Sequence, residues 1–469
     1  MNFNRRNFLK GSALTAAGIT LSGCGTLDSD RFSYPARTTL KAKKPGDKLN
    51  IGVIGVGGKG WSDWNPMFAN GENIVALCDV DRTQLDKGVA AIKEKVPGAE
   101  VKCYTDYRKM LDECKNLDAV TVSTPDHTHA LAATRAMRQG CSVYVQKPLV
   151  RTIWEARYFE KVAKESGVIT QMGNQGCAGD GLRRNVELLH AGILGKVTEV
   201  HVWTNRPIWP QGVGRPEGSD PVPDTLDWDC WLGTAPLRPF KSGVYHTFKW
   251  RGFFDFGTGA FGDMACHTMN LPFRGLRLED VVAAETLMID GKNNETYPNK
   301  SIVKVTYAAR QGMPAVKLYW YDGKEKPSAD KMPQVIATLG AVPNTGCLII
   351  GSKGIMCSTN DYGQEAYVAL KGEEKMKSTS RHEALVDIPQ TIARCKSNHY
   401  LEFVNAVKGT ETAYADIDHS VPMLEGMLVG CIAQQIPGKL RWSSCQQRFV
   451  GNELANTLLM PYVRKGFEF

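Results

Sequence analysis

The sequence predicts an α/β protein in which a doubly wound parallel sheet is followed by a second domain with a larger mixed sheet. Three observations lead to this prediction. Short apolar runs alternate with helical patterns up to residue 172, a glycine-rich turn follows the first run, and β-branched or aromatic runs take over beyond residue 173. The 469 residues suffice for two or more domains.

The first half of the chain alternates between strand-like and helix-like segments. The expected helices begin after Gly60 and cover 83–95, 106–115 and 128–139, and the expected strands cover 49–54, 73–78, 101–104, 118–123 and 141–145. Such alternation is typical of parallel strands joined by crossover helices. We place this domain at residues 48–172.

A glycine-rich turn links the first strand to the first helix. Gly55, Gly57 and Gly60 form a Gly-x-Gly-x-x-Gly pattern directly after an apolar run. In such a turn the first glycine permits a tight bend, the second lets the backbone approach phosphates, and the third lets the helix pack closely. An ordinary glycine turn is the alternative. We predict a dinucleotide site in a Rossmann-type domain, with a turn made of Gly55, Val56, Gly57, Gly58, Lys59 and Gly60.

An acidic residue ends the second expected strand. Asp79 follows 73–78, where a carboxylate can meet the adenosine ribose hydroxyls of a dinucleotide. It would repel a 2′-phosphate, so the sequence predicts NAD in preference to NADP. Arg82 keeps NADP open, because a nearby arginine can accept that phosphate.

The first residues indicate export. Arg5 and Arg6 precede a weakly apolar stretch that is too short and too polar to span a membrane, and this resembles a twin-arginine signal. Residues 21–24 resemble a lipoprotein cleavage site in which Cys24 is acylated. We expect a signal at 1–24, a tether at 25–47, and a periplasmic protein anchored by lipid. A cytoplasmic N-terminus with two chance arginines is the alternative.

The composition favours a globular body and excludes some partners. The chain is 42% hydrophobic and 23% charged, and its net charge of +8 includes no long basic run, so nucleic acid is not an expected partner. The thirteen cysteines are scattered without a Cys-x-x-Cys pair, which predicts mostly buried free thiols. His127 and His129 lie beside an aspartate, but further ligands are not evident, so no metal is expected.

The character of the chain changes beyond Gly173. Runs at 197–204, 302–308 and 315–321 carry β-branched or aromatic residues in partial alternation and are expected strands. Between them, 205–262 is rich in Trp, Pro and Gly, which is typical of a long functional connection. Helical segments near 399–408 and 419–435 are expected to pack back on the body. We place this second domain at 173–469.

Three further motifs point to a family. Residues 122–129 read Val-Ser-Thr-Pro-Asp-His-Thr-His, residues 145–149 read Val-Gln-Lys-Pro-Leu, and residues 262–267 read Gly-Asp-Met-Ala-Cys-His. With the glycine turn, this ordered set resembles the Gfo/Idh/MocA oxidoreductases over nearly all of the chain after residue 48. The resemblance implies a Rossmann-type NAD-binding domain, a C-terminal α+β domain with a large open, mostly antiparallel sheet, and a homo-oligomer.

The resemblance also implies the catalytic groups. Oxidation of a secondary alcohol needs a base for the O–H proton and a group that steadies the developing alkoxide. The resemblance places Lys147 at the nicotinamide and the reacting oxygen, His267 as acid/base, and Asp263 close to both. Asp263 and His267 are four residues apart and share one face of a helical turn, so Asp263 would orient the imidazole or bind a substrate hydroxyl. A helix-surface pair is the structural alternative. The remaining cofactor-binding residues are expected to be Asp79, Thr124, Pro125, His127, Gln146 and Lys147.

The substrate is indicated by the aromatic connection. Indole faces pack against sugar C–H surfaces, although many of these tryptophans can equally be core residues. The tryptophans in question are Trp203, Trp209, Trp228, Trp231 and Trp250. Arg183 and Arg184 sit where the second domain begins and are also candidates for the cleft. The expected substrate-binding residues are Asn174, Gln175, Arg251, Asp263 and His267.

One position departs from the family pattern. Members commonly have Glu-Lys-Pro where this chain has Gln146-Lys147-Pro148. The change removes an anion next to Lys147, which we expect to leave its ammonium less stabilised.

The sequence therefore predicts an NAD-dependent oxidoreductase that acts on a secondary alcohol of a sugar, glycoside or cyclitol. NAD is not freely supplied outside the cytoplasm, so an exported enzyme must retain it, with a binding free energy beyond about 8 kcal/mol. Two alternatives stay open. One is an NAD-dependent glycosidase that cleaves through transient C3 oxidation and elimination, and the other is a non-catalytic carbohydrate-binding lipoprotein.

Overall fold

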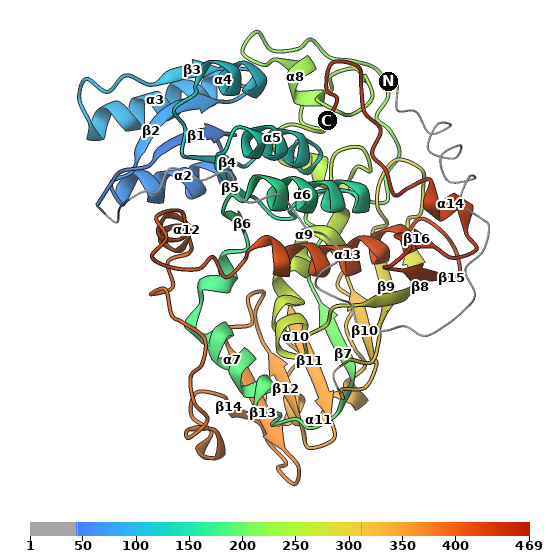
Figure 1. Cartoon of the computed structure of the whole chain (residues 1–469). Helices are drawn as coiled ribbons and strands as arrows, with labels where there is room; N and C mark the ends of the chain where they lie inside the picture. The colour runs from blue at the N-terminus through green and yellow to red at the C-terminus, as the bar shows by residue number, and fades with distance from the viewer. Residues whose placement is uncertain (1–43, 45, 311) are drawn as a thin grey trace, which may run out of the picture. The chain divides into compact units, whose positions relative to one another are not determined.

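The computed structural model describes residue 44, residues 46–310 and residues 312–469 (Figure 1). The expected signal with Cys24, and nearly all of the expected tether, lie outside the described residues. Within the described part, no helix has the length and apolar character needed to cross a membrane.

A six-stranded sheet forms the first part of the described chain. Its order is β3-β2-β1-β4-β5-β6, and neighbouring strands are parallel throughout. This order runs outward from β1 in both directions and confirms the doubly wound parallel sheet. The strands are β1 (Asn50–Ile54), β2 (Asn73–Cys78), β3 (Lys102–Tyr104), β4 (Ala119–Val122), β5 (Ser142–Val145) and β6 (Thr170–Met172).

Helices connect the strands, and local sequence sets where they start and stop. Asp81 caps one helix and Asp106 the next by accepting backbone N–H groups, while Thr152 and Glu155 form a capping box. Gly167, with φ of 65°, ends the last one. These helices are α2 (Lys59–Ala69), α3 (Arg82–Lys95), α4 (Tyr107–Glu113), α5 (Asp126–Arg138) and α6 (Ile153–Ser166).

A ten-stranded sheet follows, in the order β14-β13-β12-β11-β7-β10-β9-β8-β15-β16. Of its pairs within the described residues, β7 with β10 is parallel and the others are antiparallel, which confirms the large, mostly antiparallel sheet. The strands are β7 (Val197–Trp203), β8 (Val281–Asp290), β9 (Lys300–Tyr307), β10 (Val316–Tyr321), β11 (Gly346–Gly351), β12 (Gly354–Ser358), β13 (Ala366–Leu370), β14 (Lys377–Ser378), β15 (Lys439–Ser443) and β16 (Arg448–Phe449).

The remaining helices belong to the second part of the described chain. The α-helices are α7 (Asp180–His190), α8 (Trp228–Leu232), α9 (Gly259–Thr268), α10 (Asn270–Gly275), α11 (Pro333–Leu339), α12 (His399–Val407), α13 (Ile417–Ala433) and α14 (Glu453–Asn456). Short 3-10 turns are η1 (Gln175–Ala178), η2 (Lys249–Gly252), η3 (Ala329–Lys331) and η4 (Glu383–Leu385).

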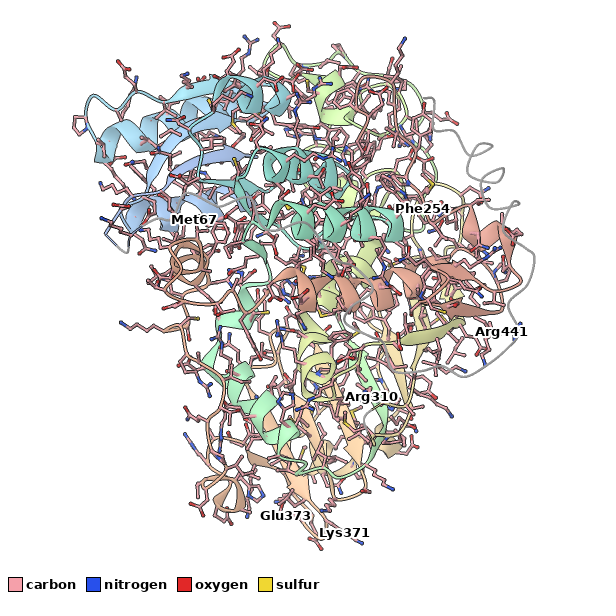
Figure 2. The ribbon with its side chains drawn as sticks, viewed as in Figure 1. Met67, Phe254, Arg310, Lys371, Glu373 and Arg441 are labelled. Carbon is pink, nitrogen blue, oxygen red and sulfur yellow. The ribbon has the colours of Figure 1, made fainter. Side chains whose placement is uncertain are left out.

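Two of these helices join the halves of the chain. Figure 1 shows α13 crossing between α6 and the ten-stranded sheet, and it contacts α6, α9, β8 and β9. Both sheets bury side chains in one apolar cluster with α13. Helix α12 packs against α2, where its Phe403 and Val404 share a second cluster with Met67 (Figure 2). The described residues thus form a single compact unit.

The cysteines are free thiols throughout the described part of the chain. Most are buried, and Cys103 and Cys445 are the exposed ones among them. This agrees with the expectation of thiols that pack as small apolar side chains.

Candidate active site

A cleft of about 560 Å³ opens at the carboxyl ends of β1, β2, β4 and β5. Helix α9 and the connection between β7 and β8 supply much of the rest of its wall. In open parallel sheets, ligands bind at this edge where the strand order reverses, which is between β1 and β4 here. The fold therefore places the cleft where a nucleotide is expected.

The glycine-rich turn leaves room for an anion beside α2. Gly55 has φ of +85°, and a Cβ there would lie 2.6 Å from the carbonyl oxygen of Ser123. A Cβ on Gly60 would lie 2.0 Å from the carbonyl oxygen of Gly55. Gly58 faces open space, since no described atom lies within 4 Å of a Cβ built there, and none of the described side chains caps α2. These residues fit a dinucleotide pyrophosphate, because N–H groups at a helix start attract anions.

Asp79 follows β2 and lines the same cleft. Its carboxylate accepts the backbone N–H of Val56 at 2.8 Å and of Gly57 at 3.2 Å. Burial raises the pKa of Asp79, and these backbone donors oppose the rise. Arg82, the residue that kept NADP open, is exposed, donates to the carbonyl oxygen of Asp224 and does not line the cleft.

Most of the predicted cofactor-binding residues meet at the cleft, and three do not. Val56 is buried and contributes its backbone N–H, while Gly60 lies beneath the turn. His127 is fully buried, and its Nε2 lies 3.0 Å from the carbonyl oxygen of Trp231, so its ring does not line the cleft. Those that line the cleft are Gly55, Gly57, Gly58, Lys59, Asp79, Thr124, Pro125, Gln146 and Lys147.

Lys147 forms a buried ion pair with Asp263 across the cleft. Its Nζ lies 2.9 Å from Asp263 Oδ1 and donates to the Asp263 carbonyl oxygen at 2.9 Å. Arg251 Nε donates to the same Oδ1 at 3.2 Å. Burial alone would raise the pKa of Asp263, but the charges of Lys147 and Arg251 hold it below its usual value. The sequence predicted that Lys147 lacks a neighbouring anion, because Gln146 replaces a glutamate. Asp263 supplies that anion from another part of the chain.

His267 lies one helical turn after Asp263 in α9, but Asn174 orients its ring. The Asn174 amide nitrogen donates to the Cys266 carbonyl oxygen at 2.5 Å, so its oxygen faces His267 Nδ1 at 2.8 Å. Nδ1 therefore carries the ring hydrogen, and Nε2 keeps its lone pair. Burial, helped by the Lys147 charge, holds the pKa of His267 well below its usual value. The imidazole is a neutral base whose observed orienting contact comes from Asn174, which leaves the binding of a substrate hydroxyl as the expected role of Asp263.

Asp126 lines the cleft although the expected site did not include it. It begins α5, is 2% exposed, and accepts the hydroxyl hydrogen of Thr258 at 3.1 Å. Burial and the charge of Asp263 raise the pKa of Asp126 to about 8, although Arg251 and Lys147 oppose the rise. The carboxyl is therefore mostly protonated at neutral pH.

The wild type is expected to lose stability as the pH rises because Asp126 must give up its proton, and replacing Asp126 by asparagine should remove this loss. The folded pKa of about 8 exceeds the usual 3.8, so the folded protein holds a proton that the unfolded chain releases. Protonation of Asp126 therefore adds to the free energy of unfolding. This contribution is fully present below the usual pKa of 3.8 and is lost as the pH rises through the folded pKa of about 8. Denaturant unfolding between about pH 5 and about pH 9 should show the wild type losing stability relative to D126N. The exposed Asp86→Asn is the control, and parallel wild-type and D126N curves would contradict the assignment.

The carboxylate of Asp63 contacts side chains from the end of β4, the end of β5 and the glycine turn. It is fully buried and accepts both from Gln146 Nε2, at 2.9 and 3.0 Å, and from the Ser123 hydroxyl at 2.8 Å. Lys59 Nζ of the glycine turn lies 2.8 Å away. Burial raises the pKa of Asp63, and these donors oppose the rise. Gln146 thus donates to an existing carboxylate, immediately before Lys147.

The tryptophan-rich connection divides between the cleft and the core. Trp203 is buried in the ten-stranded sheet, and Trp228 stacks beneath Trp231 with ring centroids 4.6 Å apart. The guanidinium of Arg251 lies 4.4 to 6.0 Å from the ring centroids of three aromatic residues, which are Trp209, Phe248 and Trp250. The tryptophans that line the cleft are Trp209, Trp231 and Trp250.

Among the other residues predicted to bind substrate or line the cleft, some reach the cleft and others do not. Gln175 lines the cleft, and Asn174 acts through His267. Arg183 forms a buried ion pair with Glu402, and Arg184 donates to backbone carbonyl oxygens, so neither reaches the cleft. Sequence reasoning missed several residues. Asp126 lies within the 122–129 stretch but was given no role, and no motif connects Asp63, Tyr362 or Phe467 with the site.

Two family models match the folded part of the chain. "Oxidoreductase family, NAD-binding Rossmann fold" matches residues 49–174, and "Oxidoreductase family, C-terminal alpha/beta domain" matches residues 187–330. A twin-arginine translocation signal sequence matches residues 2–22.

Curated relatives match a limited part of the chain. An alpha-N-acetylgalactosaminidase of Tannerella forsythia is 29% identical over 210 residues, which are 42% of this chain and 44% of that protein. A glycosyl hydrolase family 109 protein of Shewanella sp. (strain ANA-3) is 31% identical over 163 residues, 33% of this chain and 35% of that protein. The chain thus spans less than half the length of these relatives.

Solved structures share the fold over most of the chain. The WlbA dehydrogenase from Bordetella pertussis, solved with NADH and UDP-GlcNAcA, has a TM-score of 0.57 at 15% identity, covering 85% of this chain and 99% of that one. An inositol dehydrogenase homolog from Azotobacter vinelandii, solved with NADH and myo-inositol, has a TM-score of 0.57 at 16% identity, covering 86% and 99%. At these identities the likeness concerns the fold alone.

Proposed function

This chain belongs to the Gfo/Idh/MocA oxidoreductase family, and we propose on that basis that it oxidises a secondary alcohol of a sugar, glycoside or cyclitol. The supporting observation is that Lys147, Asp263 and His267 line one cleft together with the glycine turn. NAD, when bound there, supplies a hydride acceptor. The turn would hold its pyrophosphate and Asp79 its adenosine ribose.

The proposed roles follow from the charges and protonation states of these groups. Lys147 donates a hydrogen bond to the substrate oxygen as negative charge develops on it. Asp263 holds the ammonium in place through the 2.9 Å ion pair. His267 accepts the hydroxyl proton at Nε2, because Asn174 occupies Nδ1.

The aromatic wall supports a carbohydrate as the substrate. Trp209 and Trp250 line the cleft, and so do Arg251 and Gln175, whose side chains carry hydrogen-bond donors. Flat apolar faces next to polar groups suit the mixed C–H and hydroxyl surfaces of a sugar.

Export adds a constraint on the cofactor. The chain carries a twin-arginine signal, and we propose a periplasmic protein whose Cys24 is acylated. Such a protein must bring NAD with it and retain it through each turnover. A homo-oligomer stays a prediction.

A second candidate is an NAD-dependent glycosidase, which cleaves by the oxidation and elimination route without net redox change. The observation behind it is that the relatives in Tannerella and Shewanella are an alpha-N-acetylgalactosaminidase and a glycosyl hydrolase family 109 protein. The same cleft residues would serve, since both reactions begin with oxidation of a sugar hydroxyl.

One experiment separates these proposals. The purified full-length protein is denatured and the supernatant assayed for NAD, while the native protein is screened with p-nitrophenyl glycosides without added cofactor. Bound NAD with nitrophenol release establishes the glycosidase. Bound NAD without release supports a dehydrogenase that needs a second substrate. Absence of NAD would overturn both and revive the carbohydrate-binding lipoprotein.

A further inference from the structure

We propose that residues 464–467 and α8 together close the adenosine end of the cleft, and that Phe467 holds the cofactor there. We call these two segments the adenosine clasp. The inference rests on the proposed function, because it concerns how NAD is retained once bound.

The position of the clasp follows from the sheet. Asp79 marks the ribose position at the end of β2, and the adenosine half of a dinucleotide extends from there toward β3. On that side the cleft is lined by Thr105 and Asp106, which follow β3. Two further lining residues come from distant parts of the chain, Cys230 of α8 and Phe467. An adenine at this end would meet the Phe467 ring.

Two arginines hold the Phe467 ring in place. The guanidinium of Arg108 lies 4.0 Å from the ring centroid, and that of Arg464 lies 4.5 Å from it. Phe467 is 3% exposed, although it stands near the end of the chain. Such contacts order an aromatic side chain before a ligand arrives, which lowers the entropy cost of binding.

The same arginines connect the clasp to both sides of the cleft. Arg464 donates to the carbonyl oxygens of Gly233 at 3.0 Å and Asp229 at 2.7 Å, at the end of α8 and within it. Arg108 pairs with Asp106 at 2.8 Å and donates to the Gly466 carbonyl oxygen. The segment therefore links α8 to the loop between β3 and α4.

The approach to α8 is fixed to β2 as well. Arg82 N–H donates to the Thr225 carbonyl oxygen at 2.9 Å, and Asp227 N–H donates to the Val80 carbonyl oxygen at 2.8 Å. Asp81 and Leu226 form an antiparallel bridge between these stretches. Because the connection runs along the end of β2, adenosine can leave this end only after backbone hydrogen bonds break or the Phe467 contact opens.

The test measures the release of NAD from Phe467→Ala. Full-length protein loaded with NAD is diluted and trapped with excess unlabelled NAD, and the loss of labelled NAD is followed over time. We expect release to be about tenfold to a hundredfold faster than in the wild type, since contacts of this kind act mainly on dissociation. Phe469→Ala is the matched control, because that ring packs against Trp154 and Tyr158 at 5.0 and 5.3 Å, away from the cleft.

A second variant guards against a folding defect in the first. Arg464→Gln keeps the phenylalanine at position 467 but removes the link to α8 and one of the two guanidinium groups that hold its ring. It should also release NAD faster while unfolding at nearly the same denaturant concentration. Wild-type release by both F467A and R464Q would overturn the clasp and leave the proposed function standing. A wild type that never holds NAD would instead overturn the proposed function.

Discussion

Replacing Lys147 by alanine is expected to lower turnover by at least about a thousandfold while NAD stays bound. The Lys147 side chain is 13% exposed, and its Nζ is held between the carboxylate and the backbone carbonyl of Asp263. Alanine would remove this positioned cation from the substrate oxygen. The side chain lies beyond the glycine turn and Asp79, which are the groups that hold the cofactor in our proposal. We therefore expect K147A to lose turnover and to retain its bound NAD.

The chain offers a matched control for this variant. Lys241 pairs with Asp220 at 3.0 Å outside the cleft, so Lys241→Ala removes the same kind of ion pair without touching the site. Steady-state rates and released NAD should be measured on both variants. Unchanged turnover in K147A would remove Lys147 from the mechanism, and equal losses in both variants would point to a general effect of ion-pair loss.

Replacing Gln146 by glutamate is expected to lower the free energy of unfolding by roughly 3 kcal/mol at neutral pH. The new carboxyl would face the fully buried Asp63, whose oxygens lie 2.9 and 3.0 Å from the present amide nitrogen. Two carboxylates at that distance cannot both stay ionised, so the pair must take up a proton. The carboxyl pair in the folded variant has a raised pKa, so the stability that its proton provides is lost as the pH rises. The loss in free energy of unfolding should therefore grow from acidic to alkaline pH. Denaturant unfolding at several pH values measures it.

The double variant Asp63→Asn with Gln146→Glu tests the cause. It exchanges amide and carboxylate between the two positions and restores a donor facing an acceptor, so most of the lost stability should return. Failure of the exchange to rescue would show that the glutamate acts by some other route. Rescue by the exchange would explain the glutamine in the expected Glu-Lys-Pro pattern by the carboxylate that this chain places opposite residue 146.

The six-stranded sheet was largely predictable from the sequence because its strands are short, apolar and bounded by clear turns. The expected strand 118–123 is β4 (Ala119–Val122), and the expected helix 83–95 is α3 (Arg82–Lys95). The ten-stranded sheet was predictable only in part. β8 was not foreseen, because its pairing with β9 contains two register shifts that break the alternation of buried residues.

The site was predictable where its residues share a motif and not where they meet through the fold. Lys147, Asp263 and His267 stand in recognisable stretches of sequence. Asn174 meets His267 across 93 positions, and Asp63 meets Gln146 across 83, so no local pattern could pair them. The sequence placed His127 at the cofactor because its neighbours line the cleft, whereas its own ring packs against Trp231 and Phe256.

The apolar cluster shared by both sheets and α13 also governs how the cleft can open. Rotating one half of the molecule against the other would expose that common core to water, so hinge bending is opposed by the packing that stabilises the fold. Entry and exit of the substrate must then depend on local movement of the connection that carries Trp209 and Phe248, and Phe248 is 42% exposed. The two halves of the molecule therefore hold the cleft at a fixed width, while the connection at its entrance moves to admit the substrate.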